Sequence, residues 1–307
     1  RQGRCRPGLK LRIGLDLGGT KIEIIALDKA GEALLRRRVP TPQGNYRATV
    51  MAIAGLVESV EIDLQQFGTV GIGIPGAESL ADGLIKNANS TCLNGQPLRR
   101  DLQTLLQREV RLANDANCFA LSEAVDGSGR DAEVVFGVIL GTGVGGGIVV
   151  NQQVLVGANA ISGEWGHNPL PRFASDDLPP PDCYCGRQGC VETYLSGPGM
   201  CHDHERHTSQ KLSATQIEHL AGVGDADCEA TLQRYEKRLG QALAGVINIL
   251  DPQVIVLGGG LSKMSRLYQN LPACCGQHVF SDTFQTRFLP PHHGDSSGVR
   301  GAAWLWN

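Results

Sequence analysis

Three cysteines lie close together in the sequence CYCGRQGC at 183–190. Thiolates separated by short glycine-containing turns can surround one tetrahedral zinc ion, which then requires a fourth ligand. The nearest candidate for that ligand is His167, in the preceding segment EWGHNP. Three unligated thiols are the alternative, but their dense spacing favours a structural zinc site made by Cys183, Cys185, Cys190 and His167.

Two glycine-rich turns have the chemistry needed to bind phosphate groups. They are GGTK at 18–21 and GTGVG at 141–145. Backbone N–H groups in such turns can face an anion, because glycine carries no side chain that would obstruct it. Beside the first turn, Thr20 and Lys21 add a hydroxyl and a cation, and Asp16 supplies a carboxylate suited to a hydrated magnesium ion. Considered alone, the first turn could equally be a structural hairpin turn.

Asp115 lies where a predicted strand, 110–113, meets a predicted helix, 116–124. Ligand sites form at this end of the strands in open α/β sheets. The carboxylate could be only the N-cap of the helix, or a general base that accepts a proton from a hydroxyl attacking a phosphoryl group. The presence of Glu164 and of two phosphate-binding turns in the same chain favours the general base.

Two common nucleotide motifs do not fit the sequence. A Walker P-loop has Gly-Lys-Ser/Thr before a helix, whereas Lys21 is followed by a predicted strand. Gly71, Gly73 and Gly76 have the spacing of a dinucleotide motif, but Pro75 and a polar loop replace the helix that would bind pyrophosphate. Both motifs are therefore excluded.

The elements that would position these residues occur twice in the chain. A strand, a glycine turn, a second strand, another turn and a third strand begin at residue 11 and again at residue 134. This recurrence predicts an internally duplicated α/β protein, with phosphates held from both sides of a cleft between the halves. The third strand of the second copy is expected at 154–157. Other strands are predicted at 69–74, 110–113 and 253–257, and helices at 46–60, 101–108, 116–124, 229–250 and 298–306.

Composition narrows the classes of function. A length of 307 residues suggests two domains, and 41% hydrophobic with 19% charged residues is ordinary for a soluble globular protein. A formal net charge of −3 gives no basis for binding nucleic acid or a membrane surface. No apolar run approaches the ~20 residues of a membrane helix. Ten cysteines without an export signal predict reduced thiols in a cytoplasmic protein.

Two polar segments are expected to lie outside the core. Residues 1–10 are basic and lack an apolar stretch, which predicts a disordered extension rather than a secretion signal. The stretch 202–207 contains three histidines. We expect it to be a solvated surface segment, with metal binding as the alternative.

Seven motifs together resemble the ROK family of bacterial sugar kinases, repressors and open reading frames. They are DLGGTK at 16–21, GIPG at 73–76, NDANC at 114–118, GTGVGGG at 141–147, GEWGH at 163–167, CYCGRQGCVE at 183–192 and DPQVIVLGGG at 251–260. The resemblance extends from about residue 11 to the end of the chain. It implies a duplicated actin-like, ribonuclease-H-like fold, with ATP and magnesium between a small lobe, 11–118 plus 297–307, and a large lobe, 119–296, which carries the zinc-binding loop. It also suggests a homodimer.

The resemblance assigns a role to each motif residue. Asp115 would be the catalytic base, and Asp16 would attend magnesium. The sugar would be bound by Gly76, Asn89, Asn114, Glu164, His167 and Glu192, with His167 also ligating zinc. ATP would contact Gly18, Gly19, Thr20, Lys21, Thr142, Gly143, Gly258, Gly259 and Gly260.

Within the family, three segments most resemble bacterial fructokinases that also accept mannose: 86–98, 167–171 and 293–306. They predict phosphorylation of D-fructose at O6, with D-mannose as a secondary substrate. The alternative is a kinase of N-acetylglucosamine or glucose, because the family shares nearly all its chemistry among these sugars. A more remote alternative is a sugar-responsive repressor. It is disfavoured by the ten residues before the first predicted strand, which are too few for a helix-turn-helix domain, and by the near-neutral charge.

Overall fold

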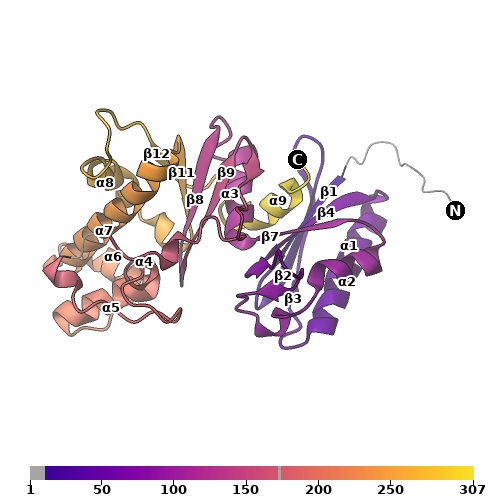
Figure 1. Ribbon diagram of the computed structural model, residues 1–307, viewed down its shortest axis with the longest axis horizontal. Coiled ribbons are helices and arrows are strands. Elements are labelled where there is room, and N and C mark those ends of the chain that lie inside the picture. Colours follow the sequence, from indigo (N-terminus) through magenta and orange to yellow (C-terminus); the bar gives the residue numbers. More distant parts are fainter. Residues whose placement is uncertain (1–10, 172–173) are drawn as a thin grey trace. The chain divides into compact units, whose positions relative to one another are not determined.

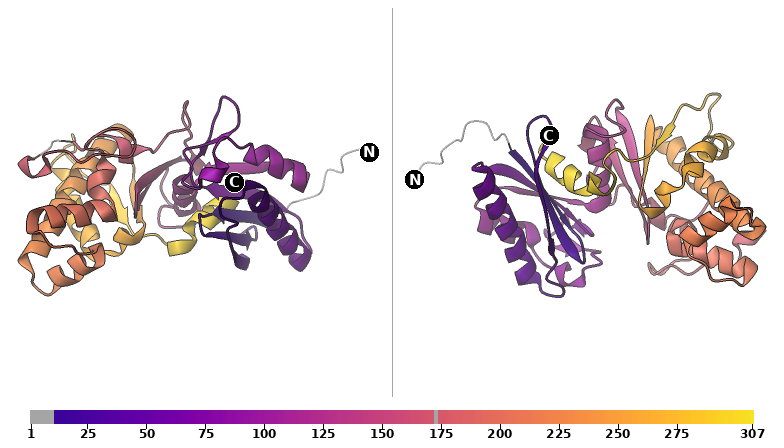
Figure 2. Two further views of the ribbon diagram at one scale, coloured as in Figure 1. Left: turned by 90° about the horizontal axis from the view of Figure 1, so that it is seen from below. Right: turned by 180° about the vertical axis from the view of Figure 1, so that it is seen from behind.

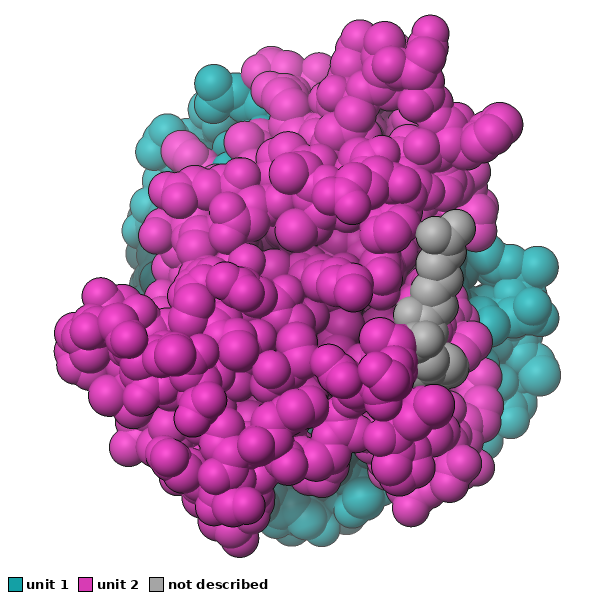
Figure 3. All heavy atoms as spheres, turned by 90° about the vertical axis from the view of Figure 1, so that its left-hand side faces the viewer, with its two compact units in different colours: residues 1–130, 152–162, 293–307 teal, residues 131–151, 163–292 magenta. Residues whose placement is uncertain are grey.

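The computed structural model describes residues 11–171 and 174–307 (Figure 1). The predicted disordered extension, 1–10, lies outside the described residues. The chain forms two compact units, which Figure 3 distinguishes by colour. Of the described residues, unit 1 contains those up to Arg130, with Gln152–Ser162 and His293–Asn307, and unit 2 contains those within Asp131–Asn151 and Gly163–His292.

Unit 1 is built on a five-stranded sheet in the order β3-β2-β1-β4-β7. Its strands are β1 (Leu11–Leu17), β2 (Lys21–Leu27), β3 (Ala33–Pro40), β4 (Gly68–Ile74) and β7 (Val110–Asn114). The first three pair antiparallel, and β4 and β7 continue from β1 as parallel strands. The three opening strands and the two that follow were all predicted. The apolar runs of β1, β2 and β4 are buried, whereas the edge strands β3 and β7 are more exposed.

Helices cover both faces of this sheet. Residues Ile13 and Leu15 of β1 join a buried cluster with α1 (Tyr46–Leu64) and α2 (Leu98–Leu106). Gly14, which points to the opposite face because side chains alternate along a strand, meets α9 (Ser297–Trp304). Helix α9 also packs on α3 (Asp115–Val125), and Figure 2 shows it in yellow beside the indigo strands.

Unit 2 repeats the strand arrangement of unit 1. Strands β9 (Val144–Val150), β8 (Val134–Leu140), β11 (Val254–Gly258) and β12 (Arg287–Leu289) are neighbours in that order. The β8–β9 pair is antiparallel, and the β8–β11 and β11–β12 pairs are parallel. The same order and directions relate β2, β1, β4 and β7, so the duplication predicted from the glycine turns is confirmed.

Five helices pack on one side of the unit 2 sheet (Figure 1). They are α4 (Val191–Leu195), α5 (Gly197–Thr208), α6 (Ala214–Gly222), α7 (Ala226–Leu250) and α8 (Ser265–Gly276). The predicted long helix is α7, which contacts all four of the others. No helix among the described residues is both long and apolar enough to cross a membrane.

Short elements complete the chain. The strands are β5 (Ala77–Glu78), β6 (Ile85–Lys86) and β10 (Gln153–Val154), and the 3₁₀ helices are η1 (Thr91–Leu93), η2 (Trp165–His167), η3 (Ser175–Asp177), η4 (Gly260–Lys263) and η5 (Gly294–Ser296). The third strand of the second copy was expected at 154–157, but β10 ends at Val154. Leu155 and Val156 are exposed, so their apolar character was wrongly read as that of a buried strand.

The histidine-containing stretch 202–207 is exposed as expected at His202 and His207, but not at His204. It lies within α5, and His204 is buried, with its Nδ1 2.9 Å from the Thr231 hydroxyl of α7. Because α5 contains many polar residues, its sequence did not indicate the helix face that packs on α7.

The compact units do not end where the predicted lobes do. Unit 1 includes residues 119–130, 152–162 and 293–296, which the sequence analysis placed in the large lobe. The first of these stretches contains most of α3, and it stays with unit 1 because α3 packs along α9.

The contact between α3 and α9 depends on Gly301. A Cβ at this position would lie 1.6 Å from the Cys118 carbonyl oxygen, which is too close for any side chain. We expect Gly301→Ala to lower the free energy of unfolding by about 3 kcal/mol, because the helices must separate to admit the methyl group. Chemical denaturation measures this change.

Gly55, exposed on α1, is the matched control. A Cβ there would meet nothing within 4 Å, so Gly55→Ala is expected to stabilise the protein by roughly 0.5–1 kcal/mol through helix propensity. Equal stability of the Gly301→Ala variant and the wild type would contradict the packing argument.

Candidate active site

The polar residues of unit 1 gather at one edge of its sheet. Asp16 is in register with Gly73 of β4, and Ile74 of β4 is in register with Asn114 of β7. These three parallel strands end at the same edge, where ligand sites form in open α/β sheets. Asp115 follows Asn114 as the first residue of α3, so both predicted acidic residues of unit 1 lie at this edge.

Asn114, and not Asp115, is the N-cap of α3. The Asn114 Oδ1 accepts the Ala116 N–H at 2.9 Å, and its Nδ2 donates to the Gly76 carbonyl at 3.1 Å. The exposed Asp115 also accepts the Ala116 N–H, at 2.8 Å. Because Asn114 already fills the capping position, Asp115 has no need to be there as a cap.

The loop that carries Asn89 packs against Gly76. A Cβ at Gly76 would lie 2.9 Å from both the amide nitrogen and the Cα of Ala88. The Asn94 side chain fixes this loop, since its Oδ1 accepts the Ala88 N–H at 2.8 Å and its Nδ2 donates to the Ala88 carbonyl at 3.0 Å. The structure therefore brings Gly76, Asn89 and Asn114 together, and it adds Asn94 as a supporting residue that the sequence analysis missed.

The first glycine turn is a tight hairpin turn whose tip is open to solvent. The Gly18 N–H donates to the Lys21 carbonyl at 3.0 Å, and the Thr41 hydroxyl donates to the Gly18 carbonyl at 2.7 Å. Gly19, Thr20 and Lys21 are exposed. An anion can therefore reach the tip of the turn.

The Asp16 carboxyl, which lies just before this turn, is harder to ionise than a carboxyl in water. Burial raises the pKa of the Asp16 carboxyl to about 6, and the negative charges of Asp115 and Glu23 add to the shift, while Lys21 opposes it. Carboxylates that repel one another in this way favour a bound divalent cation. The residues thus fit the magnesium role proposed for Asp16.

In unit 2, two further glycine segments meet at the corresponding edge. The turn 141–145 follows β8, and Gly258 at the end of β11 is in register with Ile139 of β8. The segment with Gly258, Gly259 and Gly260 is therefore beside the turn with Thr142 and Gly143. These are the residues predicted to bind ATP in this half of the chain.

Glu164 precedes the 3₁₀ helix η2 and His167 is its last residue, and η2 packs on β9. The Trp165 indole N–H donates to the Gly145 carbonyl at 2.9 Å, and the Trp165 ring lies edge-on to Phe136. This buried anchor leaves Glu164 exposed and His167 half-buried. Two predicted sugar-binding residues are thereby held next to the second glycine turn.

The four predicted zinc ligands form one cluster. The nitrogen and sulfur atoms of His167, Cys183, Cys185 and Cys190 all lie within 4.8 Å of one another. The His167 Nδ1 is 3.6 Å from the Cys183 sulfur, and the sulfurs of Cys185 and Cys190 are also 3.6 Å apart. A tetrahedron with zinc–sulfur bonds of ~2.3 Å has edges of roughly 3.8 Å, so these residues fit zinc.

The two ring nitrogens of His167 face different partners. Nδ1 faces the thiols, whereas Nε2 lies 3.1 Å from the Tyr184 hydroxyl. A zinc ligand and a sugar ligand can be the same histidine when each role uses its own nitrogen. Tyr184, 82% exposed, is a further candidate residue that the sequence analysis did not select.

A buried ion-pair network anchors the segment that leads into the cysteine cluster. The Arg238 Nε of α7 donates to Asp177 at 2.7 Å, and its NH1 pairs with Asp203 of α5 at 2.9 Å. The Tyr194 hydroxyl of α4 donates to the Asp177 carbonyl at 2.9 Å. The cysteine cluster is consequently connected to three helices.

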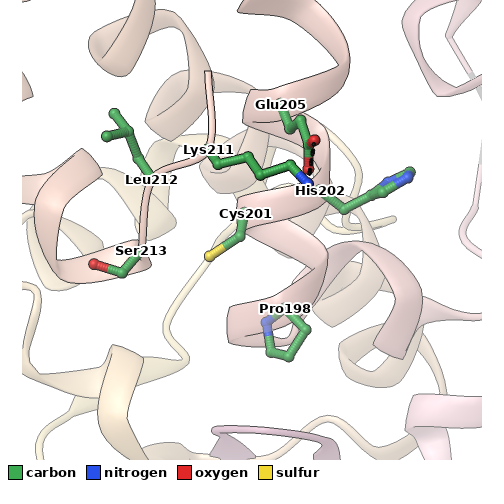
Figure 4. Close-up of a pocket in the computed structure, with 7 residues that line it drawn as sticks. All are labelled: Pro198, Cys201, His202, Glu205, Lys211, Leu212 and Ser213. Carbon is green, nitrogen blue, oxygen red and sulfur yellow. Dashed lines mark ion pairs between the residues drawn. The ribbon is translucent and has the colours of Figure 1, made fainter. Parts of the chain in front are cut away.

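A separate surface pocket of about 450 Å³ lies along α5 (Figure 4). It is lined by Pro198, Cys201, His202, Glu205, Lys211, Leu212 and Ser213, and the Lys211 ammonium pairs with Glu205 at 3.3 Å. None of these residues belongs to the predicted site.

Comparison with known proteins identifies the family. A model described as the ROK family matches residues 12–307. The chain belongs to the ROK family. Over 296 residues it is 42% identical to a protein named N-acetyl-D-glucosamine kinase from Yersinia pseudotuberculosis serotype O:1b, covering 95% of this chain and 97% of that protein. A protein of the same name from Salmonella typhimurium is 41% identical, with 95% and 98% covered.

Solved structures confirm the fold. A ROK hexokinase from Thermus thermophilus superposes with a TM-score of 0.85 at 30% identity, covering 96% of this chain and 97% of that one. A ROK family glucokinase from Streptomyces griseus, solved with glucose and AMPPNP, gives a TM-score of 0.75 at 26% identity, with 96% and 98% covered. The duplicated actin-like fold predicted from the sequence is therefore confirmed.

The raised pKa of Asp16 gives a pH-dependent stability. Ionised Asp16 destabilises the folded state above pH ~6, and this penalty disappears as the pH falls towards the unfolded value near 4. In metal-free protein we expect Asp16→Asn to raise the free energy of unfolding by about 1–3 kcal/mol at pH 8, and by less at pH 4.5. Urea denaturation at both pH values in EDTA measures this. An equal gain in the free energy of unfolding at both pH values would show that ionisation of Asp16 does not destabilise the folded protein.

The cysteine cluster predicts about one zinc ion per chain. We expect Cys185→Ser to lose most of this zinc and to lower the melting temperature, because the removal of one thiolate opens the tetrahedral site. Elemental analysis of the purified proteins measures the metal. Cys201→Ser, on α5 and outside the cluster, is the control that keeps its zinc. Equal zinc in the Cys185→Ser variant and the wild type would remove Cys185 from the ligand set.

Proposed function

We propose that the protein is an ATP-dependent sugar kinase that phosphorylates the primary hydroxyl of N-acetyl-D-glucosamine. The observation that carries this proposal is the 41–42% identity, over 95% of the chain, to proteins named N-acetyl-D-glucosamine kinase. The sequence motifs predict fructose as the substrate, with N-acetylglucosamine or glucose as the alternative. The named relatives support that alternative better.

The geometry of unit 1 supports a role for Asp115 as general base. A primary hydroxyl is a poor nucleophile at neutral pH, so a carboxylate that accepts its proton lowers the barrier to phosphoryl transfer. Asp115 is exposed and lies close enough to Asp16 for their charges to interact. The neighbouring Asn89 and Asn114 amides, with the Gly76 backbone, would orient the sugar hydroxyls.

The glycine turns support binding of the ATP phosphates. Backbone N–H groups of 18–21 and 141–145, with Lys21, would stabilise negative charge on the phosphates, and Gly258–Gly260 would lie near the adenosine. Magnesium, bound at Asp16 with the phosphates, would neutralise further charge. Glu164, Glu192 and the His167 Nε2 would bind further sugar hydroxyls. A structural zinc ion would hold His167 in place.

The segments used to favour fructose explain why that choice was weak. Residues 86–98 contain Asn89 and its support Asn94, and residues 167–171 contain His167. Both segments hold hydroxyl-binding groups that many hexoses can use. In the proposed enzyme they would line the sugar site, but they do not by themselves distinguish a ketose from an amino sugar.

A coupled assay of ADP release tests the substrate. It compares N-acetylglucosamine, glucose, fructose, mannose and N-acetylmannosamine with ATP and magnesium. We expect kcat/KM to be highest for N-acetylglucosamine. A higher value for fructose would restore the earlier prediction, and no ADP release with any sugar would overturn the proposed kinase activity.

Asp115→Asn provides the control for mechanism in this assay. The amide cannot accept the hydroxyl proton, so kcat is expected to fall roughly 10²–10⁴-fold, while the melting temperature stays near that of the wild type. Retained turnover would exclude Asp115 as the base.

A further inference from the structure

Glu192, a predicted sugar-binding residue, contacts the second glycine turn. Its Oε2 accepts the backbone N–H of Val144 at 2.8 Å. A Cβ at Gly143 would lie 2.7 Å from the same oxygen, so the carboxylate approaches the turn at a position where a side chain is missing. The turn residues beside it, Thr142 and Gly143, are those predicted to bind ATP phosphates.

The chain around Glu192 is fixed on both sides. Cys190, a predicted zinc ligand, is the N-cap of α4, and the Val191 N–H donates to the Asn168 carbonyl at 2.8 Å. At the other end of α4, the Gly197 N–H donates to the Gly141 carbonyl at 2.8 Å. The α4 segment therefore contacts the glycine turn twice, through the Glu192 carboxylate and through the first residue of α5.

A carboxylate can serve two partners at once. Each oxygen has two lone pairs, so Oε2 can hold the Val144 N–H while Oε1 accepts a hydroxyl. Hydrogen bonds to an ionised acceptor are roughly twice as strong as neutral ones. The Val144 N–H is consequently held where it is, and with it the path of the turn from Gly141 to Gly145.

We propose that Glu192 is a positioning residue for the nucleotide-binding turn as well as a sugar ligand. This inference rests on the proposed function, which places ATP phosphates at the turn. One side chain then links the two substrates, because its acceptor oxygen sets the conformation of the turn and its other oxygen binds the sugar. Nucleotide affinity is expected to depend on Glu192 even when no sugar is present.

The test compares Glu192→Ala with Glu192→Gln. Both variants remove the negative charge, but only glutamine keeps a side-chain oxygen that can accept the Val144 N–H. Calorimetry with AMPPNP and magnesium, in the absence of sugar, measures nucleotide binding. We expect Kd to be about tenfold higher for Glu192→Ala than for Glu192→Gln, which is ~1.4 kcal/mol. Equal Kd values for the two variants would overturn the proposal.

Glu164 supplies the matched control, since it is also a predicted sugar-binding carboxylate of unit 2. Glu164→Ala and Glu164→Gln are expected to bind AMPPNP equally while both raise the KM for sugar. A similar loss of nucleotide affinity in Glu164→Ala would show that the effect is not specific to the Val144 contact, and would overturn the proposal.

A second variant tests the same contact by changing a residue of the turn instead of Glu192. Gly143→Ala places a methyl group against Glu192 Oε2, and it is expected to weaken AMPPNP binding to a similar extent. Sugar-dependent ADP release by the wild type tests the proposed function separately. Wild-type kinase activity combined with equal Kd values for Glu192→Ala and Glu192→Gln overturns this inference alone, whereas a wild type that binds no AMPPNP overturns both.

Discussion

Both units obey one topological constraint, which is that a single central strand has an antiparallel partner on one side and a parallel partner on the other. β1 lies between β2 and β4, and β8 lies between β9 and β11. The glycine turn that ends the central strand is therefore at the same sheet edge as the carboxyl ends of the parallel strands. Asp16 and Asn114 in unit 1, and Gly258 in unit 2, are at that edge for this reason.

The two units carry different functional groups at this edge of their sheets. Unit 1 places carboxylates and amides at the ends of its strands, and the pKa of Asp16 is raised there by burial and, to a smaller extent, by the charges of Asp115 and Glu23. Unit 2 instead inserts the cysteine cluster and α4 between β9 and β11, which brings Glu192 to the turn. In the proposed reaction, unit 1 would supply the base, and unit 2 would supply much of the sugar recognition.

Local patterns in the sequence were sufficient to predict much of this architecture. The hairpins around the two glycine turns, the helix α7 and the grouping of Cys183, Cys185 and Cys190 all follow from the spacing of nearby residues. His204 was misjudged because its burial depends on Thr231, a residue distant in sequence. The same applies to the contact between Glu192 and Val144. The preferred sugar was harder still, since hydroxyl-binding groups are common to many hexose sites.

The position of α9 in the chain has a consequence for biosynthesis. This helix fills the face of the unit 1 sheet formed by Gly14 of β1 and Gly71 of β4, yet it follows every residue of unit 2 in the sequence. During translation, unit 2 can emerge and fold while the opening sheet still lacks its final layer. Until residues 297–304 leave the ribosome, that face of the sheet lacks the helix that covers it. The packing of the unit 1 sheet is therefore completed only after all of unit 2 has been synthesised.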